Sequence, residues 1–192
     1  MISNGKFYES QFEEATIELL REAHWQYAFG DDIHRKYTDP LIEEDLRNFL
    51  AVQYKDKNLT TSEMDSIVAN LRNTGGQNDY YALRNAFLLY RDGYDFAYSD
   101  GRSNPFRLEY IDFEHPDHNI FRCVNQFVME QGRENRRPDI LLFINGIPVC
   151  IIELKNPTKQ NATIHDAHTQ ICTRYMRDIP ALLKYCALAV IS

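Results

Sequence analysis

Apolar residues recur at helical spacing through residues 1–100 of the chain. In the segment 9–24, the stripe along one helical face consists of Phe12, Ala15, Leu19 and Ala23. Three further helices are expected, at 39 to about 54, at 61 to about 74 and at 78 to about 92. Their N-terminal signals are Asp39-Pro40, Thr61 and Asn78. We expect these three helices to form an added helical layer, with a core that includes the aromatic residues Tyr80, Tyr81, Phe87 and Tyr90.

The pattern changes to that of β-strands after a loop at 103–105. Alternation predicts strands at 107–113 and 119–129, with a turn at 115–117 between them. Two nearly continuous apolar runs then flank Asn145-Gly146, a dipeptide typical of tight β-hairpins. A helix at 164–178 and a short apolar strand at the end of 182–191 follow. This order of elements indicates an α/β fold, with a mixed sheet of about four or five strands flanked by helices.

Charged residues stand at one end of the apolar hairpin. Asp139 precedes the first strand, and the second strand ends in Glu153-Leu154-Lys155. Strand side chains alternate between the two faces, so Glu153 and Lys155 lie on the same face. Charges in such an apolar setting are costly to bury unless they are paired or bind a metal ion. The end of the hairpin is therefore the candidate site of the chain.

The residue types at this end suit metal-dependent hydrolysis of a phosphodiester. Two carboxylates and a backbone carbonyl, here that of Leu154, are hard oxygen ligands for Mg²⁺ or Mn²⁺. A lysine beside them can orient water or stabilise charge on a phosphate. Pro138-Asp139, a spacer and Glu153-x-Lys155 match the signature of PD-(D/E)xK nucleases. The pattern is short. The alternative without a functional site is a surface aspartate at the start of one strand and a Glu–Lys pair on an edge strand.

The register of the hairpin bears on this interpretation. With a strict two-residue turn at Asn145-Gly146, Asp139 pairs with Ile152, and the two acids face opposite sides of the sheet. One extra residue restores the pairing of Asp139 with Glu153. Pro148 cannot donate a hydrogen bond to the ladder, which favours an irregularity here. We predict a one-residue bulge or a longer turn.

The sequence around the hairpin resembles the N-terminal nuclease domain of the R (restriction) subunit of type I restriction–modification enzymes. The matching blocks are Asn125-Gln126-Phe127-Val128, 137–148 and Ile152-Glu-Leu-Lys-Asn-Pro157, followed by Tyr175-Met-Arg-Asp-Ile-Pro180 and 185–192. Residues 120–192 carry most of the resemblance, the first helix with Phe12-Glu13 less, and the middle of the chain hardly any. The fold that this resemblance implies is a PD-(D/E)xK restriction-endonuclease-like core.

The resemblance also implies roles for the residues at the end of the hairpin. Asp139 and Glu153 would bind Mg²⁺, with Mn²⁺ as the other option, and Lys155 would position the attacking water. Glu13 of the first helix would be a further metal ligand. The alternative is that Glu13 is an ordinary, exposed glutamate of that helix. Arg137 lies next to Pro138-Asp139 in the sequence and is a candidate DNA contact.

Two residues of the helix at 164–178 are implied to contact DNA or support the site, namely Gln170 and Tyr175. Type I R subunits resemble one another in a Gln and a Tyr four residues apart, on one helical face. Here the two are five residues apart, which rotates them by about 100° in an α-helix. This spacing predicts either a changed role for Gln170 or a differently tuned site.

The composition is that of a globular protein with a substantial core: 192 residues, of which 44% are hydrophobic and 26% charged. No apolar run has the length of a membrane span, and the first residues lack the pattern of a signal peptide. The four cysteines are scattered without metal-binding spacing, so we expect free core thiols in a reducing cytoplasm. His115 and His118 also lack nearby Cys or further His, and we interpret them as solvated loop residues rather than metal ligands.

The charge distribution argues against an autonomous DNA-binding domain. The net charge is −7, and residues 1–100 hold 10 basic against 18 acidic side chains. Residues 101–192, which contain the candidate site, hold 11 against 10. Non-specific DNA affinity depends on Lys and Arg contacts to phosphates. We therefore expect a larger assembly to deliver the DNA.

We interpret residues 1–192 as one endonuclease-like domain, with a helical part at about 1–100 and the sheet and catalytic core at about 101–192. The sequence contains no Gly-x4-Gly-Lys-Ser/Thr phosphate loop and stops directly after an apolar run, so we expect an N-terminal fragment of a longer, motor-containing chain. The resemblance implies that the whole protein binds ATP, translocates and cuts unmodified foreign DNA, and works with methylation and specificity subunits. Two alternatives stay open: another PD-(D/E)xK nuclease, for repair or junction cutting, and a catalytically silent scaffold that docks on a motor or on partner subunits.

Overall fold

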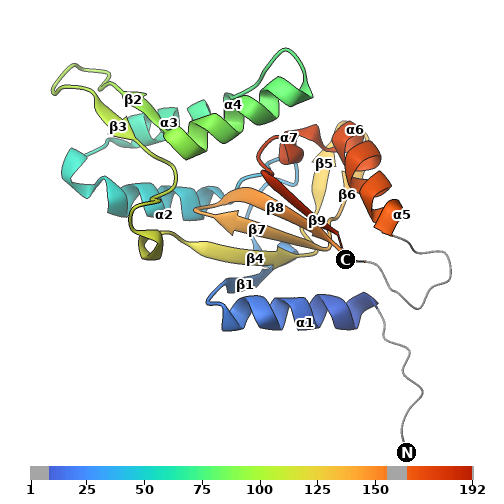
Figure 1. Ribbon diagram of the computed structural model, residues 1–192. Helices are drawn as coiled ribbons and strands as arrows, with labels where there is room; N and C mark the ends of the chain where they lie inside the picture. The colour runs from blue at the N-terminus through green and yellow to red at the C-terminus, as the bar shows by residue number, and fades with distance from the viewer. Residues whose placement is uncertain (1–8, 155–163, 192) are drawn as a thin grey trace, which may run out of the picture.

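A mixed β-sheet forms the centre of the computed structural model, which describes residues 9–154 and 164–191. In these residues its five strands run in the spatial order β1-β4-β7-β8-β9 (Figure 1). Their bounds are Gln26–Phe29 for β1, Phe121–Asn125 for β4, Ile140–Ile144 for β7, Ile147–Glu153 for β8 and Leu188–Ile191 for β9. The outer pairs, β1–β4 and β8–β9, are parallel, and the two inner pairs are antiparallel. The predicted α/β fold with a mixed sheet is confirmed.

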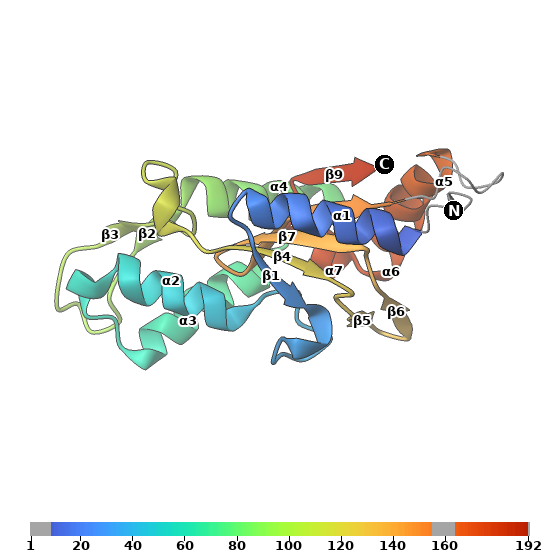
Figure 2. The ribbon, with the colours of Figure 1, turned by 90° about the horizontal axis from the view of Figure 1, so that it is seen from below.

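Helices cover both faces of the sheet (Figures 1 and 2). One face packs against α1 (Glu9–Glu22), through a cluster that includes Ile140 and Ile152. The other face packs against the segment that follows β8, through a cluster that includes Leu141 and Ile151. This segment consists of α5 (Ile164–Thr169), the π-helix η4 (Gln170–Tyr175), α6 (Met176–Asp178) and α7 (Pro180–Leu183). Alternate residues of the central strands thus serve two different helical layers.

The packed face of α1 differs from the stripe that the sequence predicts. Phe12 belongs to it, but Leu19 is 65% exposed, and Ala15 and Ala23 are exposed too. Ile17 and Leu20 take their place against the sheet. A face with Phe, Ile and Leu removes more apolar area from water than one with two alanines, which explains the choice. Glu13 lies on this side of the helix and is half-buried.

The expected helical layer lies at one end of the sheet (Figures 1 and 2). It contains α2 (Glu43–Gln53), α3 (Thr61–Asn73) and α4 (Asp79–Asp92). The hairpin of β2 (Tyr94–Phe96) and β3 (Phe106–Leu108) follows α4 and packs with these helices. Of the four aromatic residues expected in its core, Tyr90 is buried and Phe87 partly buried. Tyr80 and Tyr81 are 67% and 43% exposed, so that expectation is wrong for them.

Two helix starts differ from the prediction. The side chain of Asp39 accepts a hydrogen bond from the Leu41 N–H, which forms a local turn, and α2 begins only at Glu43. In α3 the cap is Thr60 rather than Thr61, and it forms a capping box with Glu63. The start of α4, with Asn78 as the cap, is confirmed.

The predicted strands upstream of the hairpin are too long. The strand expected at 107–113 corresponds to β3, which ends at Leu108. The strand expected at 119–129 is divided into β4 and β5 (Met129–Gln131), because Gln126 adopts a left-handed φ of 56° between them. β5 pairs instead with β6 (Glu134–Arg136) in a separate hairpin.

Two further sequence expectations concern membranes and thiols. No helix in the described residues is long and apolar enough to cross a bilayer. All four cysteines lie in the described residues and are free. Three of them are buried as expected, but Cys172 is exposed on η4, so the expected core position is wrong for it.

Candidate active site

A bulge in β8 gives the hairpin the register that the sequence analysis required. The register shifts in the middle of the hairpin and leaves Val149 as the extra residue. Beyond the shift, Ile140 pairs with Ile152. The next residues outward, Asp139 and Glu153, therefore stand opposite each other. The predicted irregularity is confirmed, and it places the two acids at the same end of the sheet.

The turn of this hairpin is anchored in the helical layer. Asn145 and Gly146 both have left-handed φ angles, of 50° and 76°, as in a two-residue hairpin turn of type I′. Asn145 is fully buried, and its amide donates to the Tyr110 carbonyl at 2.9 Å. The carbonyl of Gly146 accepts a hydrogen bond from the Ile42 N–H at 2.9 Å. The end of the hairpin opposite the acids is thus fixed to the rest of the protein.

Each of the two acids accepts a short hydrogen bond. Oδ2 of Asp139 accepts from the backbone N–H of Leu154 at 2.7 Å. Glu153 is fully buried, and its Oε2 accepts from Nε2 of Gln170 at 2.7 Å. A buried carboxylate is costly without polar partners, and Gln170 supplies one from the layer that covers this face. These bonds fix the directions of both carboxylates.

The five-residue spacing of Gln170 and Tyr175 is accommodated by a π-helix. The segment η4 spans Gln170–Tyr175, and π-helical hydrogen bonding runs from residue i to i+5. Nε2 of Gln170 consequently lies 2.7 Å from the Tyr175 hydroxyl, to which it donates. The predicted separation of the two side chains is wrong, because it assumed α-helical geometry. Short π-helical segments frequently occur at functional sites.

Tyr175 forms the buried wall of this site. Burial, together with the neighbouring Glu153 carboxylate, raises the pKa of the Tyr175 hydroxyl well above its ordinary value. A neutral hydroxyl can hold a hydrogen bond beside a carboxylate without adding a second negative charge. Tyr175 therefore remains protonated throughout the pH range in which the protein would act.

Glu13 reaches the same end of the sheet from α1. Its Oε1 accepts hydrogen bonds from the side-chain amides of Asn125 at 2.7 Å and Gln126 at 3.1 Å. Asn125 pairs with Ile140, the residue that follows Asp139. A cavity of about 470 Å³ opens here, lined by residues that include Glu13, Asn125, Gln126 and Tyr27. No site role was predicted for the two amides, which lay inside the strand expected at 119–129, and their signal was the block Asn125-Gln126-Phe127-Val128 of the family resemblance.

Comparisons with known proteins identify the family of the chain. The family described as "Type I restriction enzyme R protein N terminus" matches residues 6–192. The chain belongs to this family. It is 29% identical, over 96% of its length, to the "Type I restriction enzyme HindI endonuclease subunit" of Haemophilus influenzae. It is 31% identical, over 94% of its length, to the "Putative type I restriction enzyme MjaIXP endonuclease subunit" of Methanocaldococcus jannaschii. The chain spans 18% of the length of each of these two relatives.

The basic residues singled out in the sequence lie in different settings. Arg137 is exposed, two residues before Asp139. Its neighbour Arg136 is used in the fold, since its Nε donates to Oδ2 of the buried Asp178 at 2.8 Å. Lys155 lies outside the described residues, so its role in the site stays a prediction.

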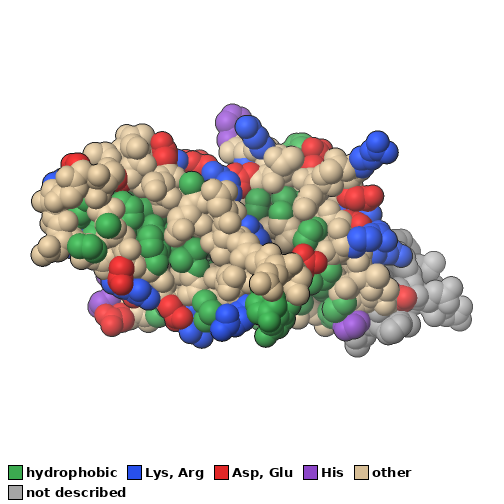
Figure 3. Space-filling view, turned by 90° about the horizontal axis from the view of Figure 1, so that it is seen from above, with side chains coloured by type: hydrophobic (Ala, Val, Ile, Leu, Met, Phe, Trp, Pro, Cys, Tyr) green, Lys and Arg blue, Asp and Glu red, His purple; other side chains and the backbone are tan. Residues whose placement is uncertain are grey.

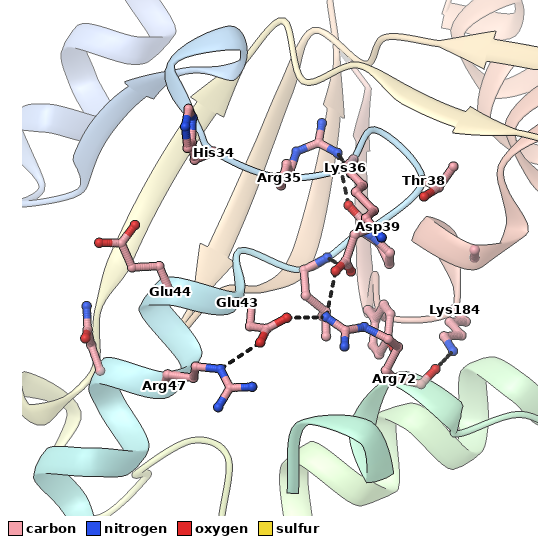
Figure 4. A pocket seen from close by; sticks show the side chains of 15 residues that line it. His34, Arg35, Lys36, Thr38, Asp39, Glu43, Glu44, Arg47, Arg72 and Lys184 are labelled. Carbon is pink, nitrogen blue, oxygen red and sulfur yellow. Dashed lines mark hydrogen bonds and ion pairs between the residues drawn. The ribbon is translucent and has the colours of Figure 1, made fainter. Parts of the chain in front are cut away.

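A larger cavity lies elsewhere, between α2, α3, α7 and the loop before α2 (Figure 4). Its volume is about 810 Å³, and none of the acids of the hairpin lines it. Arg72 in this cavity forms ion pairs with Asp39 at 2.6 Å and with Glu43 at 2.7 Å. The two carboxylates that converge in this cavity are thus neutralised by a guanidinium, which stands where a metal ion would have to bind. We therefore take the end of the hairpin as the candidate active site.

Proposed function

We propose that this chain is the metal-dependent DNA endonuclease domain of a type I restriction enzyme R subunit, with a PD-(D/E)xK core. The observation that carries the proposal is the bulge at Val149, which sets Asp139 opposite Glu153 at one end of the sheet. A regular hairpin would have separated these two acids. Membership of the R-protein family supports the same activity and favours restriction over DNA repair or junction cutting.

The donor set at this end of the sheet fits Mg²⁺ or Mn²⁺. Asp139 and Glu153 supply carboxylate oxygens, and Leu154 supplies a backbone carbonyl next to Glu153. Hard oxygen ligands of this kind suit both ions, while a soft thiolate or imidazole set would not. When bound, the ion supplies charge stabilisation at the scissile phosphate and lowers the pKa of a coordinated water. Glu13 is a proposed third carboxylate ligand, reaching the site from α1.

The chain's own residues orient the carboxylates and shape the site. The Leu154 N–H holds Asp139, and the Gln170 amide holds Glu153. Tyr175 supports Gln170 from the buried side and excludes water behind Glu153. Lys155 follows this pair in the Glu-x-Lys pattern, and we propose that it positions the attacking water. Arg137, exposed next to Asp139, is a proposed contact to the DNA backbone.

We propose that the rest of the R subunit delivers the DNA to this site. On the face shown in Figure 3, Lys and Arg side chains are interspersed with Asp and Glu and do not form one basic field. With a net charge of −7, the domain offers little non-specific attraction for phosphates. We infer that the complete protein uses ATP-driven translocation, acts on unmodified foreign DNA in the cytoplasm, and assembles with methylation and specificity subunits.

The first test of this function is metal binding, measured by calorimetry with Mg²⁺ and Mn²⁺. Three proteins are compared: the wild type, Asp139→Asn, and Asp95→Asn as the matched control. Asp95 lies on β2 in the helical layer, and its side chain is 77% exposed. We expect the wild type and the control to bind equally, and Asp139→Asn to lose about tenfold or more in affinity. Asn retains an oxygen that can accept from the Leu154 N–H, so the variant should fold.

The same three proteins are then assayed for nicking of supercoiled plasmid. We expect weak, Mg²⁺-dependent nicking by the wild type and the control, and none by Asp139→Asn. Binding without nicking would still support the site, because the proposal couples efficient cleavage to translocation. If the wild type bound neither ion, with or without DNA, the scaffold interpretation would replace the nuclease.

A further inference from the structure

Three potential metal ligands lie together in the loop between β3 and β4, away from the acids of the hairpin. They are Asp112, His115 and His118, and one ligand atom from each lies within 4.8 Å of the others. Nδ1 of His118 is 3.0 Å from Oδ2 of Asp112, and Nδ1 of His115 is 3.6 Å from the same oxygen. The two imidazole rings stack at a centroid distance of 5.0 Å. Both histidines are thus directed at one carboxylate oxygen.

The carboxylate at the centre of this cluster is fixed in place. Asp112 is only 5% exposed, and its Oδ1 accepts from the N–H groups of Glu114 at 3.1 Å and His115 at 2.8 Å. Oδ2 also accepts from Nε2 of Gln53 on α2 at 3.1 Å. The backbone of Asp112 is bonded through both its N–H and its carbonyl to the side chain of Asn119. The loop therefore holds its carboxylate in position before any ligand arrives.

We propose that Asp112, His115 and His118 bind a divalent transition-metal ion of the Zn²⁺ or Co²⁺ class. In a tetrahedral site with metal–ligand distances of about 2.0–2.2 Å, the ligand atoms are about 3.3 Å apart. The distances of 3.0 Å and 3.6 Å around Asp112 Oδ2 lie on either side of that value. Two imidazoles and one carboxylate favour Zn²⁺ or Co²⁺ over Mg²⁺, because imidazole nitrogen is a softer donor than oxygen.

The two histidine side chains are 63% and 55% exposed, which leaves the outer side of the site open to solvent. A fourth ligand, water or a group from another molecule, can therefore complete the coordination. Binding requires the histidine nitrogens that face Asp112 to be unprotonated, with the ring proton on the other nitrogen. From the sequence, these histidines were interpreted as solvated loop residues. The sequence does not reveal that Asp112, three positions before His115, is buried and lies against both imidazole rings.

The proposed site is linked to the hairpin that carries the acids. The side chain of Asn119, which is hydrogen-bonded to the backbone of Asp112, also accepts a hydrogen bond through Oδ1 from the Asn145 amide at 2.8 Å. Asn145 is the first residue of the hairpin turn and is fully buried. A metal ion that cross-links Asp112, His115 and His118 would therefore stabilise the loop against which this turn is packed. We expect its effect in stability rather than in the chemistry of Asp139 and Glu153.

The test uses Zn²⁺ and Co²⁺ on the whole 192-residue chain, with Mg²⁺ present in excess to occupy the acids of the hairpin. Calorimetry measures Zn²⁺ affinity, visible absorption measures the coordination of Co²⁺, and thermal unfolding measures the Zn²⁺-dependent rise in Tm. Four proteins are compared: the wild type, the double variant His115→Ala/His118→Ala, His34→Ala, and Asp139→Asn. His34 is an exposed histidine outside the cluster and controls for adventitious binding.

We expect the wild type, His34→Ala and Asp139→Asn to bind one equivalent of Zn²⁺ and to show the same rise in Tm. The double variant should lose at least about tenfold in affinity together with the rise in Tm. Both substituted side chains are exposed, and Asp112 keeps its bonds from the backbone and from Gln53, so the Tm without metal should fall only slightly. Equal Zn²⁺ binding by the double variant, or no binding by the wild type, would overturn the proposal. Neither result would contradict the proposed nuclease function, which Asp139→Asn tests separately with Mg²⁺.

Discussion

Gln170 and Tyr175 are five residues apart in the sequence, yet the amide of Gln170 donates to the hydroxyl of Tyr175 at 2.7 Å. The π-helix η4 makes this contact possible, because its hydrogen bonds span five residues. Its extra residue is absorbed locally, because Ile171 within η4 and Ile179 after it are both buried. The contact matters because the same amide also holds the buried Glu153.

The first prediction is that η4 tolerates the loss of one residue. Deletion of the exposed Thr173 would leave Gln170 and Tyr175 four residues apart, the spacing that an α-helix brings together. We expect the free energy of unfolding to change by less than about 1 kcal/mol, since the buried residues keep their places. Mg²⁺ affinity should be retained. Urea unfolding and calorimetry on the deletion variant measure the two quantities.

Deletion of Arg84, an exposed residue in the middle of α4, is the matched control. This helix contains no π-helical turn, so the deletion rotates Ala86 and Tyr90 by about 100° relative to the first turn. Both are buried in the helical layer, and we expect a loss of about 3 kcal/mol or more. Equal destabilisation by the two deletions would show that the extra residue of η4 is structurally required.

The sequence predicted the elements and the register of the hairpin well because local signals and one geometric requirement agreed there. Asn145-Gly146 specified the turn, and Asp139 could face Glu153 only if one extra residue was present in the hairpin. A one-residue irregularity was therefore predictable before the structure was known, and the structure shows it to be a bulge at Val149 rather than a longer turn. The hypothesis that both acids belong to one site supplied the constraint that local sequence signals lack.

Other features depended on tertiary contacts that local periodicity does not record. The packed face of α1 is determined by its contact with the sheet. Ile17 and Leu20 pack there instead of the predicted Leu19. The end of β4 was set by the left-handed φ of Gln126, a conformation without a reliable signal in a non-glycine residue. The π-helix was missed because helical spacing was evaluated with α-helical geometry alone.

A second prediction concerns Gly146 in the hairpin turn. A Cβ atom there would lie 2.1 Å from the Ile42 carbonyl oxygen, in addition to the strain of φ +76°. Gly132, in the turn between β5 and β6, has a similar φ of +64° with open space around it. We expect Gly132→Ala to cost about 1–2 kcal/mol from backbone strain alone. Gly146→Ala should cost several kcal/mol, about 3 or more, because the backbone of Ile42 must also move.

Urea unfolding of the two alanine variants separates these contributions. Their difference measures the close approach between the turn and the segment before α2, since the left-handed strain is common to both. If the two variants were equally stable, the contact with Ile42 would contribute nothing, and the turn would not be anchored as described.

A third prediction is a pH dependence of stability that originates at Glu63. Bonds from the Arg102 guanidinium and the Thr60 N–H lower the pKa of Glu63 to about 2, from an ordinary value of 4.5. A carboxylate with a lowered pKa in the folded state stabilises the protein above the unfolded pKa and loses that contribution as the pH falls through the folded value. This contribution should therefore be complete above pH 4.5 and decline progressively towards pH 2.

The measurement is the urea midpoint from pH 6 downward for the wild type and Glu63→Gln. Glutamine has a similar shape and no titrating group, so the difference between the two midpoints should narrow as the pH falls. Asp65→Asn, two residues away with a side chain that is 58% exposed, is the control and should follow the wild type more closely. A constant difference between wild type and Glu63→Gln across this range would contradict the assigned pKa.

The last prediction decides whether Glu13 belongs to the metal site. Its carboxylate accepts from Asn125 and Gln126 at the end of the sheet where Asp139 stands, but α1 packs on the face opposite η4. Glu13→Gln keeps an oxygen for the amides and removes the negative charge. If Glu13 is a ligand, Mg²⁺ affinity measured by calorimetry should fall about tenfold, while Tm changes little.

The control is Glu22→Gln, because Glu22 is exposed at the end of α1. This variant should bind Mg²⁺ as the wild type does. Unchanged affinity in Glu13→Gln would restrict the carboxylate ligands to Asp139 and Glu153 and leave Glu13 the role of ordering the two amides.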